Sequence, residues 1–327
     1  MNRMLGMGNA LTDVLIQLPD AALLQQFGLA AGSMQLITPE VAETLAKASE
    51  RFPQSLASGG SASNTMRAAA RLGADCGFIG KIGNDSYGKS FRENLEKCGI
   101  RPALSVSSDN MSGFAMTFIT PNGERTFATY LGAAAQLAPE DLLPEMFDGY
   151  RLFHVEGYLV QNYALIEKAM RMAKEKGLQV SLDLASFNVV EENLDFLKHL
   201  VNNYVNIVFA NEEEAKAFTG KEAEEALTEI ASQAPIAIVK VGAKGSLIRQ
   251  GNTVHRIPVV KAERIDTTAA GDFYAAGFLY AYSQGKPLEV CGQAGSLMGS
   301  RIIEVVGADF SEEKWCQIKE EIKQIIQ

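Results

Sequence analysis

The sequence is poor in cysteine and has no long hydrophobic run, and each shortage excludes a class of protein. Its four cysteines, Cys76, Cys98, Cys291 and Cys316, form no Cys-x-x-Cys pair, so we expect reduced thiols instead of a disulfide framework or a zinc site. No apolar stretch approaches the roughly 18–20 residues that span a membrane. Asp13 interrupts the N-terminal segment, which therefore predicts a first strand and not a signal peptide. These features predict a cytoplasmic protein with no membrane partner.

Positive charge is also scarce, because 30 basic residues face 39 acidic ones and give a formal net charge of −9. Binding to nucleic acid needs a surplus of Lys and Arg, so the composition argues against a nucleic-acid partner. A small anionic ligand is still compatible, since a helix N-terminus and a metal ion supply a local positive field. The length of 327 residues, 47% of them hydrophobic, fits one large globular domain or two ordinary ones.

From about residue 61 onward, short apolar runs alternate with amphipathic segments. Near-continuous apolar strands that alternate with helices are typical of a parallel sheet covered on both faces. The sequence therefore predicts an α/β fold. The expected strands are 76–82, 151–155, 179–184, 206–210 and 236–241, and the expected helices are 61–72, 88–97, 162–176, 191–201 and 212–218.

Two regions break this alternation, because 11–37 and 113–130 have strand-like patterns without an intervening long helix. The sequence Pro-Asn-Gly-Glu at 121–124 predicts a hairpin turn. Paired in space, the two regions would form a small sheet over one end of the main domain and act as a lid that excludes water. The alternative is an ordinary extension of the main sheet.

The most informative segment is 265–282, in which a Thr- and Gly-containing loop leads directly into an apolar helix. The small residues Ala269, Ala270 and Gly271 place backbone N–H groups at the positive end of that helix, which predicts an anion site. Asp272 has two interpretations at this stage. It either complements the helix dipole or serves as the general base in phosphoryl transfer to an alcohol.

Two further segments place polar groups where ligands bind. Gly60 follows Gly59 in a loop that permits close backbone approach, and Asn64 projects from the first turn of the next helix, although both also suit an ordinary helix cap. Asn211 and Glu214 follow an apolar strand, and ligands of parallel α/β sheets bind at the carboxyl ends of strands. A solvated helix start is the alternative for this pair.

Two other matches point to different nucleotide-binding classes. Residues 83–90, Gly-Asn-Asp-Ser-Tyr-Gly-Lys-Ser, fit the P-loop pattern and would make the chain a P-loop NTPase. Against this, Asp85 puts a carboxylate inside a loop that should hold phosphates. Residues 6–11 form a dinucleotide fingerprint that lacks its third glycine.

Taken together, five ordered segments resemble the PfkB (ribokinase-like) family of carbohydrate and nucleoside kinases, and the resemblance covers essentially the whole chain. Asp-Thr-Thr-Ala-Ala-Gly-Asp at 266–272 is similar to the family's C-terminal signature, and Gly-Gly-Ser-Ala-Ser-Asn-Thr at 59–65 to its N-terminal one. The other three segments are 80–89, 211–214 and 240–246. Within this resemblance the P-loop match is a coincidence.

The family implies one domain over 1–327 with a ribokinase-like three-layer α/β/α architecture, a mainly parallel sheet and a small β lid formed by about 11–37 and 113–130. It also implies ATP as phosphoryl donor, Mg²⁺, a possible K⁺ requirement, a small-molecule acceptor, and a monomer or homodimer.

The resemblance further implies a role for individual residues. Asp272 would be the base, the amides of Ala269, Ala270 and Gly271 would hold the transferring phosphoryl group, and Glu214 would organise Mg²⁺ through water. Asp266 would be a K⁺ ligand. The substrate would be bound by Asn9, Asp13, Gly60, Asn64 and Phe187, and ATP by Asn211, Glu214, Lys240, Gly242, Lys244, Gly245 and Thr267.

The choice of substrate depends on residues 181–190. Sugar kinases of the family typically carry Asp-x-Asn-x-Arg there, whereas this chain reads Ser-Leu-Asp-Leu-Ala-Ser-Phe-Asn-Val-Val without an Arg. That stretch is similar to adenosine-kinase-like members, and Phe187 or Tyr158 would stack on a base, a buried core aromatic being the alternative. The sequence thus favours a hydroxymethyl of adenosine or a related nucleoside as acceptor. A free sugar such as ribose or fructose is the alternative.

Overall fold

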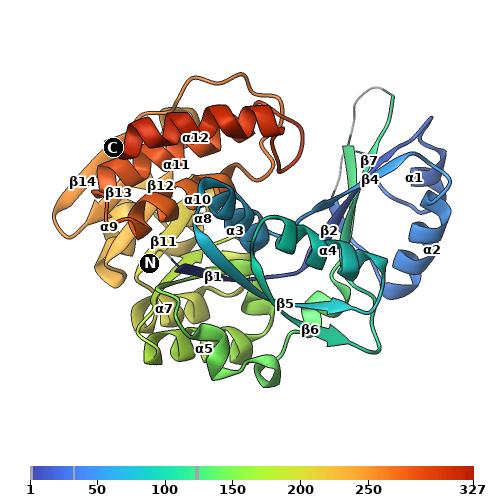
Figure 1. The fold of residues 1–327 in the computed structure, drawn as a ribbon, viewed down its shortest axis with the longest axis horizontal. Coiled ribbons are helices and arrows are strands. Elements are labelled where there is room, and N and C mark those ends of the chain that lie inside the picture. Colours follow the sequence, from blue (N-terminus) through green and yellow to red (C-terminus); the bar gives the residue numbers. More distant parts are fainter. Residues whose placement is uncertain (1–2, 32–33, 122–124) are drawn as a thin grey trace.

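The computed structural model describes residues 3–31, 34–121 and 125–327, which form two sheets (Figure 1). The larger has nine strands in the order β14-β13-β12-β11-β10-β9-β1-β5-β6, and the smaller has five in the order β3-β8-β7-β2-β4. The strands from β12 to β6 are parallel, and β12, β13 and β14 are antiparallel. The bounds in the larger sheet are β1 (Arg3–Met7), β5 (Asp75–Gly83), β6 (Arg101–Ser107), β9 (Leu152–Glu156), β10 (Gln179–Asp183), β11 (Ile207–Asn211), β12 (Ile236–Lys240), β13 (Ser246–Gln250) and β14 (Thr253–Ile257).

Helices cover both faces of this sheet, so the predicted three-layer α/β/α fold is confirmed (Figure 1). One face packs against α3 (Ser61–Leu72), α4 (Ser86–Lys97), α10 (Ala270–Ser283), α11 (Leu288–Ile302) and α12 (Glu312–Ile326). The other packs against α5 (Tyr163–Glu175), α6 (Phe187–Glu192), α7 (Leu194–Asn203), α8 (Glu212–Thr219) and α9 (Ala223–Gln233). Short 3₁₀ turns occupy η1 (Gly132–Gln136), η2 (Pro139–Asp141), η3 (Pro144–Phe147), η4 (Gly157–Gln161) and η5 (Gly242–Lys244).

One expected helix is wrong in its bounds. The segment 191–201 is divided between α6 and α7 at Asn193, and α6 begins earlier, at Phe187. The reason is local, because the Ser186 hydroxyl accepts a hydrogen bond from the Val189 N–H (3.4 Å) and caps the earlier start.

The two strand-rich regions meet in the smaller sheet, as expected, because β2 (Leu11–Gln17) pairs in parallel with β7 (Gly113–Ile119). The other strands are β3 (Met34–Leu36), β4 (Gln54–Ser58) and β8 (Arg125–Tyr130), and α1 (Ala22–Gln26) and α2 (Pro39–Ser49) pack on one face. The expected turn at 121–124 lies mostly outside the described residues. Within the described part of the chain, no helix has both the length and the apolarity needed to cross a membrane.

Candidate active site

A cavity of about 940 Å³ opens where three parallel strands end beside the start of α10. Asp183, Asn211 and Lys240 are the last residues of β10, β11 and β12, and each lines this cavity. Ligands of parallel α/β sheets bind at this edge because the strand ends and the following helix N-termini converge there. The remaining wall comes from the loop before α10, the turn at 242–245, the first turn of α3 and one side of α11.

The start of α10 lies where the sequence predicts an anion site, at the wall of this cavity. Ala269, the residue before the helix, has φ 59°, in the left-handed region that costs a non-glycine residue about 1–2 kcal/mol. This turn brings Ala270, Gly271 and Asp272 to the cavity wall, where the first N–H groups of a helix have no partner within the helix. A Cβ at Gly271 would lie 3.0 Å from Lys240 Nζ, so the glycine lets an ammonium group approach the anion site.

Asp272 is held in one orientation by helix α3. Its Oδ1 accepts a hydrogen bond from Ser61 Oγ (2.6 Å), and its Oδ2 accepts one from Asn64 Nδ2 (3.0 Å). Burial raises the pKa of Asp272 to about 6, although these two hydrogen bonds oppose the rise. A fixed carboxylate with a pKa close to neutrality, beside an anion site, suits a general base better than a group that only complements the helix dipole.

Asp13 and Gly60 lie next to this carboxylate, although neither lines the cavity. Burial raises the pKa of Asp13 to about 6, the nearby Arg67 opposes the rise, and the charge of Asp272 adds to it. Gly60 precedes α3 with φ +82°, and a Cβ there would clash with the Asn9 carbonyl oxygen. Three of the predicted acceptor residues, Asp13, Gly60 and Asn64, thus lie on the α3 side of Asp272.

Asn9 has a supporting position and does not line the cavity. Its side chain donates to Glu156 Oε1 (2.9 Å) and accepts a hydrogen bond from Gln161 Nε2 (3.1 Å). Glu156 Oε2 in turn accepts from the Ala62 N–H (2.8 Å), so this buried carboxyl joins β9 and α3 to the segment that follows β1. Burial raises the pKa of Glu156 to about 7. Sequence reasoning gave Glu156 no role, because it is the last residue of an apolar strand.

On the nucleotide side, Asn211 and Glu214 form a reciprocal cap at the start of α8. The Asn211 N–H and Nδ2 donate to Glu214 Oε2 (2.8 Å) and Oε1 (2.6 Å), and the Glu214 N–H donates to Asn211 Oδ1 (2.8 Å). Lys240 Nζ lies 3.1 Å from Oδ2 of Asp183, a residue that sequence reasoning also missed. Burial opposes the charge on Lys240, but Asp183 and Glu214 outweigh it and raise the pKa of this amine.

The acidic groups of the cavity fit Mg²⁺ bound together with a nucleotide. Mg²⁺ usually keeps several waters and takes one or two carboxylates in addition to substrate phosphates. Glu214 and Asp183 are such carboxylates, and burial raises the pKa of Glu214 to about 7. No group of three or more His, Cys, Asp or Glu side chains gathers among the described residues, so the phosphates would supply the remaining ligands.

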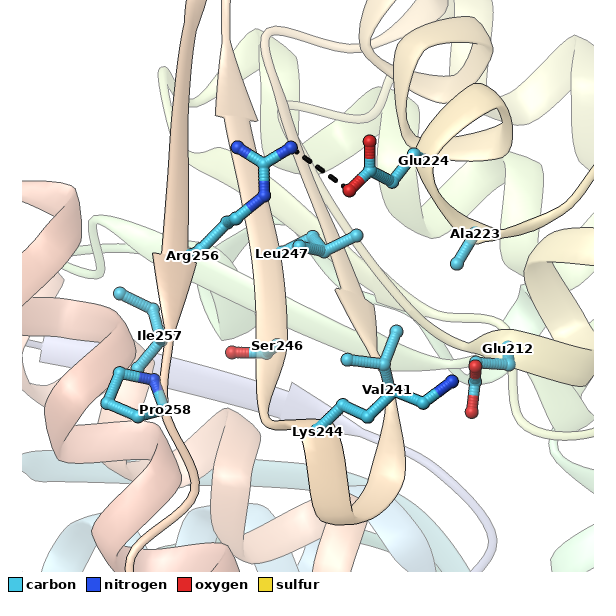
Figure 2. A pocket seen from close by; sticks show the side chains of 10 residues that line it. All are labelled: Glu212, Ala223, Glu224, Val241, Lys244, Ser246, Leu247, Arg256, Ile257 and Pro258. Carbon is cyan, nitrogen blue, oxygen red and sulfur yellow. Dashed lines mark hydrogen bonds and ion pairs between the residues drawn. The ribbon is translucent and has the colours of Figure 1, made fainter.

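Other predicted residues divide into two groups. Gly242, Gly245 and Thr267, which the sequence predicts to bind ATP, line the cavity. Lys244 instead lines a second cavity of about 440 Å³ on β12–β14, where its amine points toward Glu212 (Figure 2).

Phe187 and Asp266 also lie outside the cavity lining. Phe187 is 42% exposed at the start of α6, and the aromatics that line the cavity are Tyr158 and the buried Tyr274. The Asp266 carboxylate accepts hydrogen bonds from the Thr268 N–H (3.0 Å) and the Gly307 N–H (2.9 Å), so in this structure it orders the loop. A K⁺ ion at Asp266 stays a prediction.

The P-loop alternative is wrong for a physical reason. The Asp85 carboxylate caps α4, because its Oδ1 accepts from the Gly88 N–H (2.9 Å), and its Oδ2 accepts from the Ser112 N–H (2.6 Å). A carboxylate therefore stands where a P-loop would bind phosphate. Lys89 is exposed and pairs with Glu93 on the same helix (3.9 Å).

Fold and site together define a phosphotransferase that acts on a hydroxyl group. A family model described as pfkB family carbohydrate kinase matches residues 27–315, and the chain belongs to this family. Its members transfer phosphate from ATP to a sugar or nucleoside.

Known proteins resemble the chain along most of its length. A probable sugar kinase structure from Rhizobium etli is 32% identical, covers 98% of this chain and 97% of its own, and has a TM-score of 0.85. The adenosine kinase structure from Sinorhizobium meliloti is 31% identical, with 97% and 98% coverage and a TM-score of 0.84. Adenosine kinase of Saccharomyces cerevisiae (79% of this chain, 81% of its own) and ribokinase of Haemophilus influenzae (78% and 84%) are each 27% identical.

Proposed function

We propose that the protein is an ATP-dependent, Mg²⁺-requiring nucleoside kinase that phosphorylates the hydroxymethyl group of adenosine or a related ribosyl compound. The observation that carries this choice is the composition of the cavity wall after β9 and β10. Tyr158 lines the cavity with 43% of its surface exposed, and residues 181–190 contain no Arg. An aromatic face suits a nucleobase, whereas a guanidinium would suit an anionic or polyhydroxylated substrate.

The similarity to known enzymes agrees with a nucleoside as substrate and also supports a free sugar as the second candidate. The adenosine kinase of S. meliloti is 31% identical to this chain over nearly the full length of both. A probable sugar kinase is 32% identical, and the ribokinase and the yeast adenosine kinase are equally distant. A free sugar such as ribose is therefore the second candidate, favoured by these kinases alone.

In the proposed reaction, Asp272 accepts the proton of the acceptor hydroxyl while the oxygen of that hydroxyl attacks the γ-phosphorus of ATP. The bond from this phosphorus to the bridging oxygen breaks, and ADP leaves. The amides of Ala270 and Gly271 stabilise charge on the transferring group, and Lys240 adds a positive charge beside them. Mg²⁺ would neutralise phosphate charge, held near Glu214 and Asp183. Asp13, Gly60 and Asn64 would bind the ribosyl hydroxyls.

We also propose that the chain is one domain in which the five-stranded sheet acts as a lid. Segments 11–37 and 113–130 contribute β2, β3, β7 and β8 to this sheet, and Asp13 lies on β2 close to Asp272. A sheet that carries an acceptor residue and is packed by helices on one face has the arrangement needed to close over substrate and exclude water.

The test is a panel of nucleosides and free sugars assayed for acceptor-dependent release of ADP from ATP, with Mg²⁺ and with excess EDTA. We expect adenosine or a close relative to give the highest kcat/KM and every activity to vanish in EDTA. A free sugar that outranks all nucleosides would overturn the substrate choice, and full activity in EDTA would overturn the Mg²⁺ requirement. Activity with no acceptor at all would contradict the proposal as a whole.

A further inference from the structure

We propose that Arg67 is a positioning residue for the acceptor side of this site. Its guanidinium sets the direction in which the Asn64 amide faces and fastens the segment 307–309 to helix α3. The inference rests on the proposed function, because Asn64 is taken to bind the acceptor.

Arg67 is a buried cation next to the site. It is 5% exposed, and Arg is seldom buried unless its donors are paired. Nη1 donates to Asn64 Oδ1 (3.4 Å), and Nη2 donates to the Ala308 carbonyl oxygen (2.8 Å) and lies 3.7 Å from Asp309 Oδ2. The residue therefore joins the first turns of α3 to a segment far away in the sequence.

The contact with Asn64 determines the direction of an amide. Asn64 lies between a group that only donates, Arg67, and a carboxylate that only accepts, Asp272. With Oδ1 toward the guanidinium, Nδ2 donates to Asp272 Oδ2, as observed at 3.0 Å. The reversed amide would place oxygen against carboxylate and NH₂ against guanidinium, so both contacts would become repulsive. Arg67 thus keeps a donor directed at the proposed base.

The segment 307–309 connects this pair to the anion loop. The Gly307 N–H donates to Asp266 Oδ2 (2.9 Å) at the start of that loop, while the next carbonyl, that of Ala308, accepts from Arg67. Asp309 Oδ1 also accepts from Trp315 Nε1 (3.0 Å) on α12. One short segment is therefore held from the acceptor side by Arg67 and from the phosphate side by Asp266.

Arg67 also acts on acceptor-site carboxylates through its charge. It opposes the rise in the pKa of Asp13, while Asp272 adds to that rise. Asp272 itself faces Ser61 and Asn64 from α3. The charges of Asp183 on β10 and Lys240 on β12 also act on its pKa. The charge of Asp272 in turn raises the pKa values of Glu156 and Tyr158. Loss of Arg67 alone should therefore raise the pKa of Asp13 further above its usual value.

The experiment compares Arg67→Met with Arg71→Met, a matched control one turn further along the same helix. Arg71 pairs with Glu312 of α12 (2.6 Å) and stacks on Trp315, so its loss also weakens the contact between α3 and α12. Acceptor binding without nucleotide is measured by calorimetry, and kcat, KM and their pH profiles are measured with the best acceptor of the panel. Thermal unfolding shows whether each variant is folded.

We expect Arg67→Met to weaken acceptor binding and raise acceptor KM roughly ten- to hundredfold, as for a lost hydrogen bond to a charged group. Its KM for ATP should change little. The fall in acceptor affinity at low pH should move to higher pH, because the pKa of Asp13 rises. Arg71→Met should keep wild-type values. Arg67→Lys retains the charge, but an ammonium group lacks the forked donors that reach Asn64 and Ala308 together. We therefore expect weaker acceptor binding in this variant, with the low-pH fall in binding at the same pH as in the wild type.

Equal acceptor affinity and equal pH profiles in Arg67→Met and Arg71→Met would overturn the inference. If Arg67→Met does not fold, Arg67→Lys decides, and wild-type acceptor binding in that variant would overturn it as well. Failure of the proposed function is a separate result, because it would show as wild-type protein without kinase activity on any acceptor of the panel.

Discussion

The two sheets of the molecule differ in how they are covered. Every residue of β9 is buried, because helices pack on both faces of the larger sheet, whereas β2 of the smaller sheet alternates between buried and partly exposed positions. Val14 and Ile16 pack under α1 and α2, and Asp13 lies on the opposite face. The comparison teaches that the proposed base, Asp272, stands on a helix packed against the sheet that is covered on both faces, whereas the proposed acceptor residue Asp13 stands on the less covered sheet.

The largest effect expected on the smaller sheet is at Asp13. Asp13→Asn should raise acceptor KM roughly ten- to hundredfold, because hydrogen bonds from substrate hydroxyls to a charged group are lost, and should leave KM for ATP nearly unchanged. Steady-state kinetics with both substrates varied checks this. Asp20→Asn, at an exposed residue before α1, is the control. An Asp13→Asn variant that loses kcat but keeps acceptor KM would contradict the claim that the smaller sheet contributes to acceptor binding and not to the chemical step.

The pH dependence follows from the raised carboxyl pKa values. Asp272 and Asp13 have pKa values of about 6, so both are protonated at pH 5 and ionised at pH 8. A base works only when ionised, and kcat/KM should therefore rise through about pH 6 and level off above pH 7.

Stability should change in the opposite direction. A carboxyl whose folded pKa is raised contributes stability that is fully present below its unfolded pKa and is lost as pH rises through the folded pKa. Denaturant unfolding at pH 5 and pH 8 measures how much of the free energy of unfolding is lost as these carboxyls ionise. Asp272→Asn is the variant that removes one such group. A kcat/KM profile that is flat from pH 5 to 8 would contradict the assignment of these groups.

A smaller effect is expected in the amide exchange of the two sheets. Binding of acceptor with a non-hydrolysable ATP analogue should slow exchange in β2 and β7 and leave β9 and β11, already buried, unchanged. Hydrogen exchange followed by mass spectrometry measures both sets of peptides in one sample. Unchanged exchange in β2 and β7 at saturating ligands would remove the lid and leave the catalytic assignment standing.

The smallest effect concerns Ala269. Ala269→Gly removes the steric cost of a left-handed alanine and adds backbone entropy to the unfolded chain, so the free energy of unfolding should rise by about 0.5–1 kcal/mol. Denaturant unfolding measures the change. Gly73→Ala is the comparison of opposite sign. Because Gly73 has φ +109°, the alanine variant should be less stable than the wild type. A destabilised Ala269→Gly variant would mean that the turn is not strained.

The sequence could predict the centre of the larger sheet better than its edges. Strands β9 to β12 are almost entirely buried because helices cover both of their faces, and the apolar runs of β11 and β12 make this pattern visible in the sequence. Edge strand β6 is only partly buried, and β13 and β14 form a hairpin with partly exposed residues, so their sequences resemble loops. The strand β4 was missed for the same reason, since it pairs only with β2.

The site divides in a similar way. Asp272, Asn64 and Asn211 were predictable because each lies at the start of a helix, a position that the sequence marks, whereas Lys240 came from the family resemblance. The directions of the Lys244 and Phe187 side chains were not predictable, because a tight turn and the Ser186 cap determine them. Asp183 and Glu156 were missed because, unlike Asn211, neither is followed directly by the capping pattern of an α-helix.

The central claim is that Asp272 is the base of the reaction, and Asp272→Asn tests it most directly. The amide keeps the shape of the α10 turn but cannot accept the proton, so kcat should fall by roughly two to four decades with KM for both substrates little changed. The measurement is kcat at saturating ATP and acceptor, on protein whose thermal unfolding matches the wild type. A folded Asp272→Asn enzyme that keeps more than about a tenth of the wild-type kcat would contradict the account.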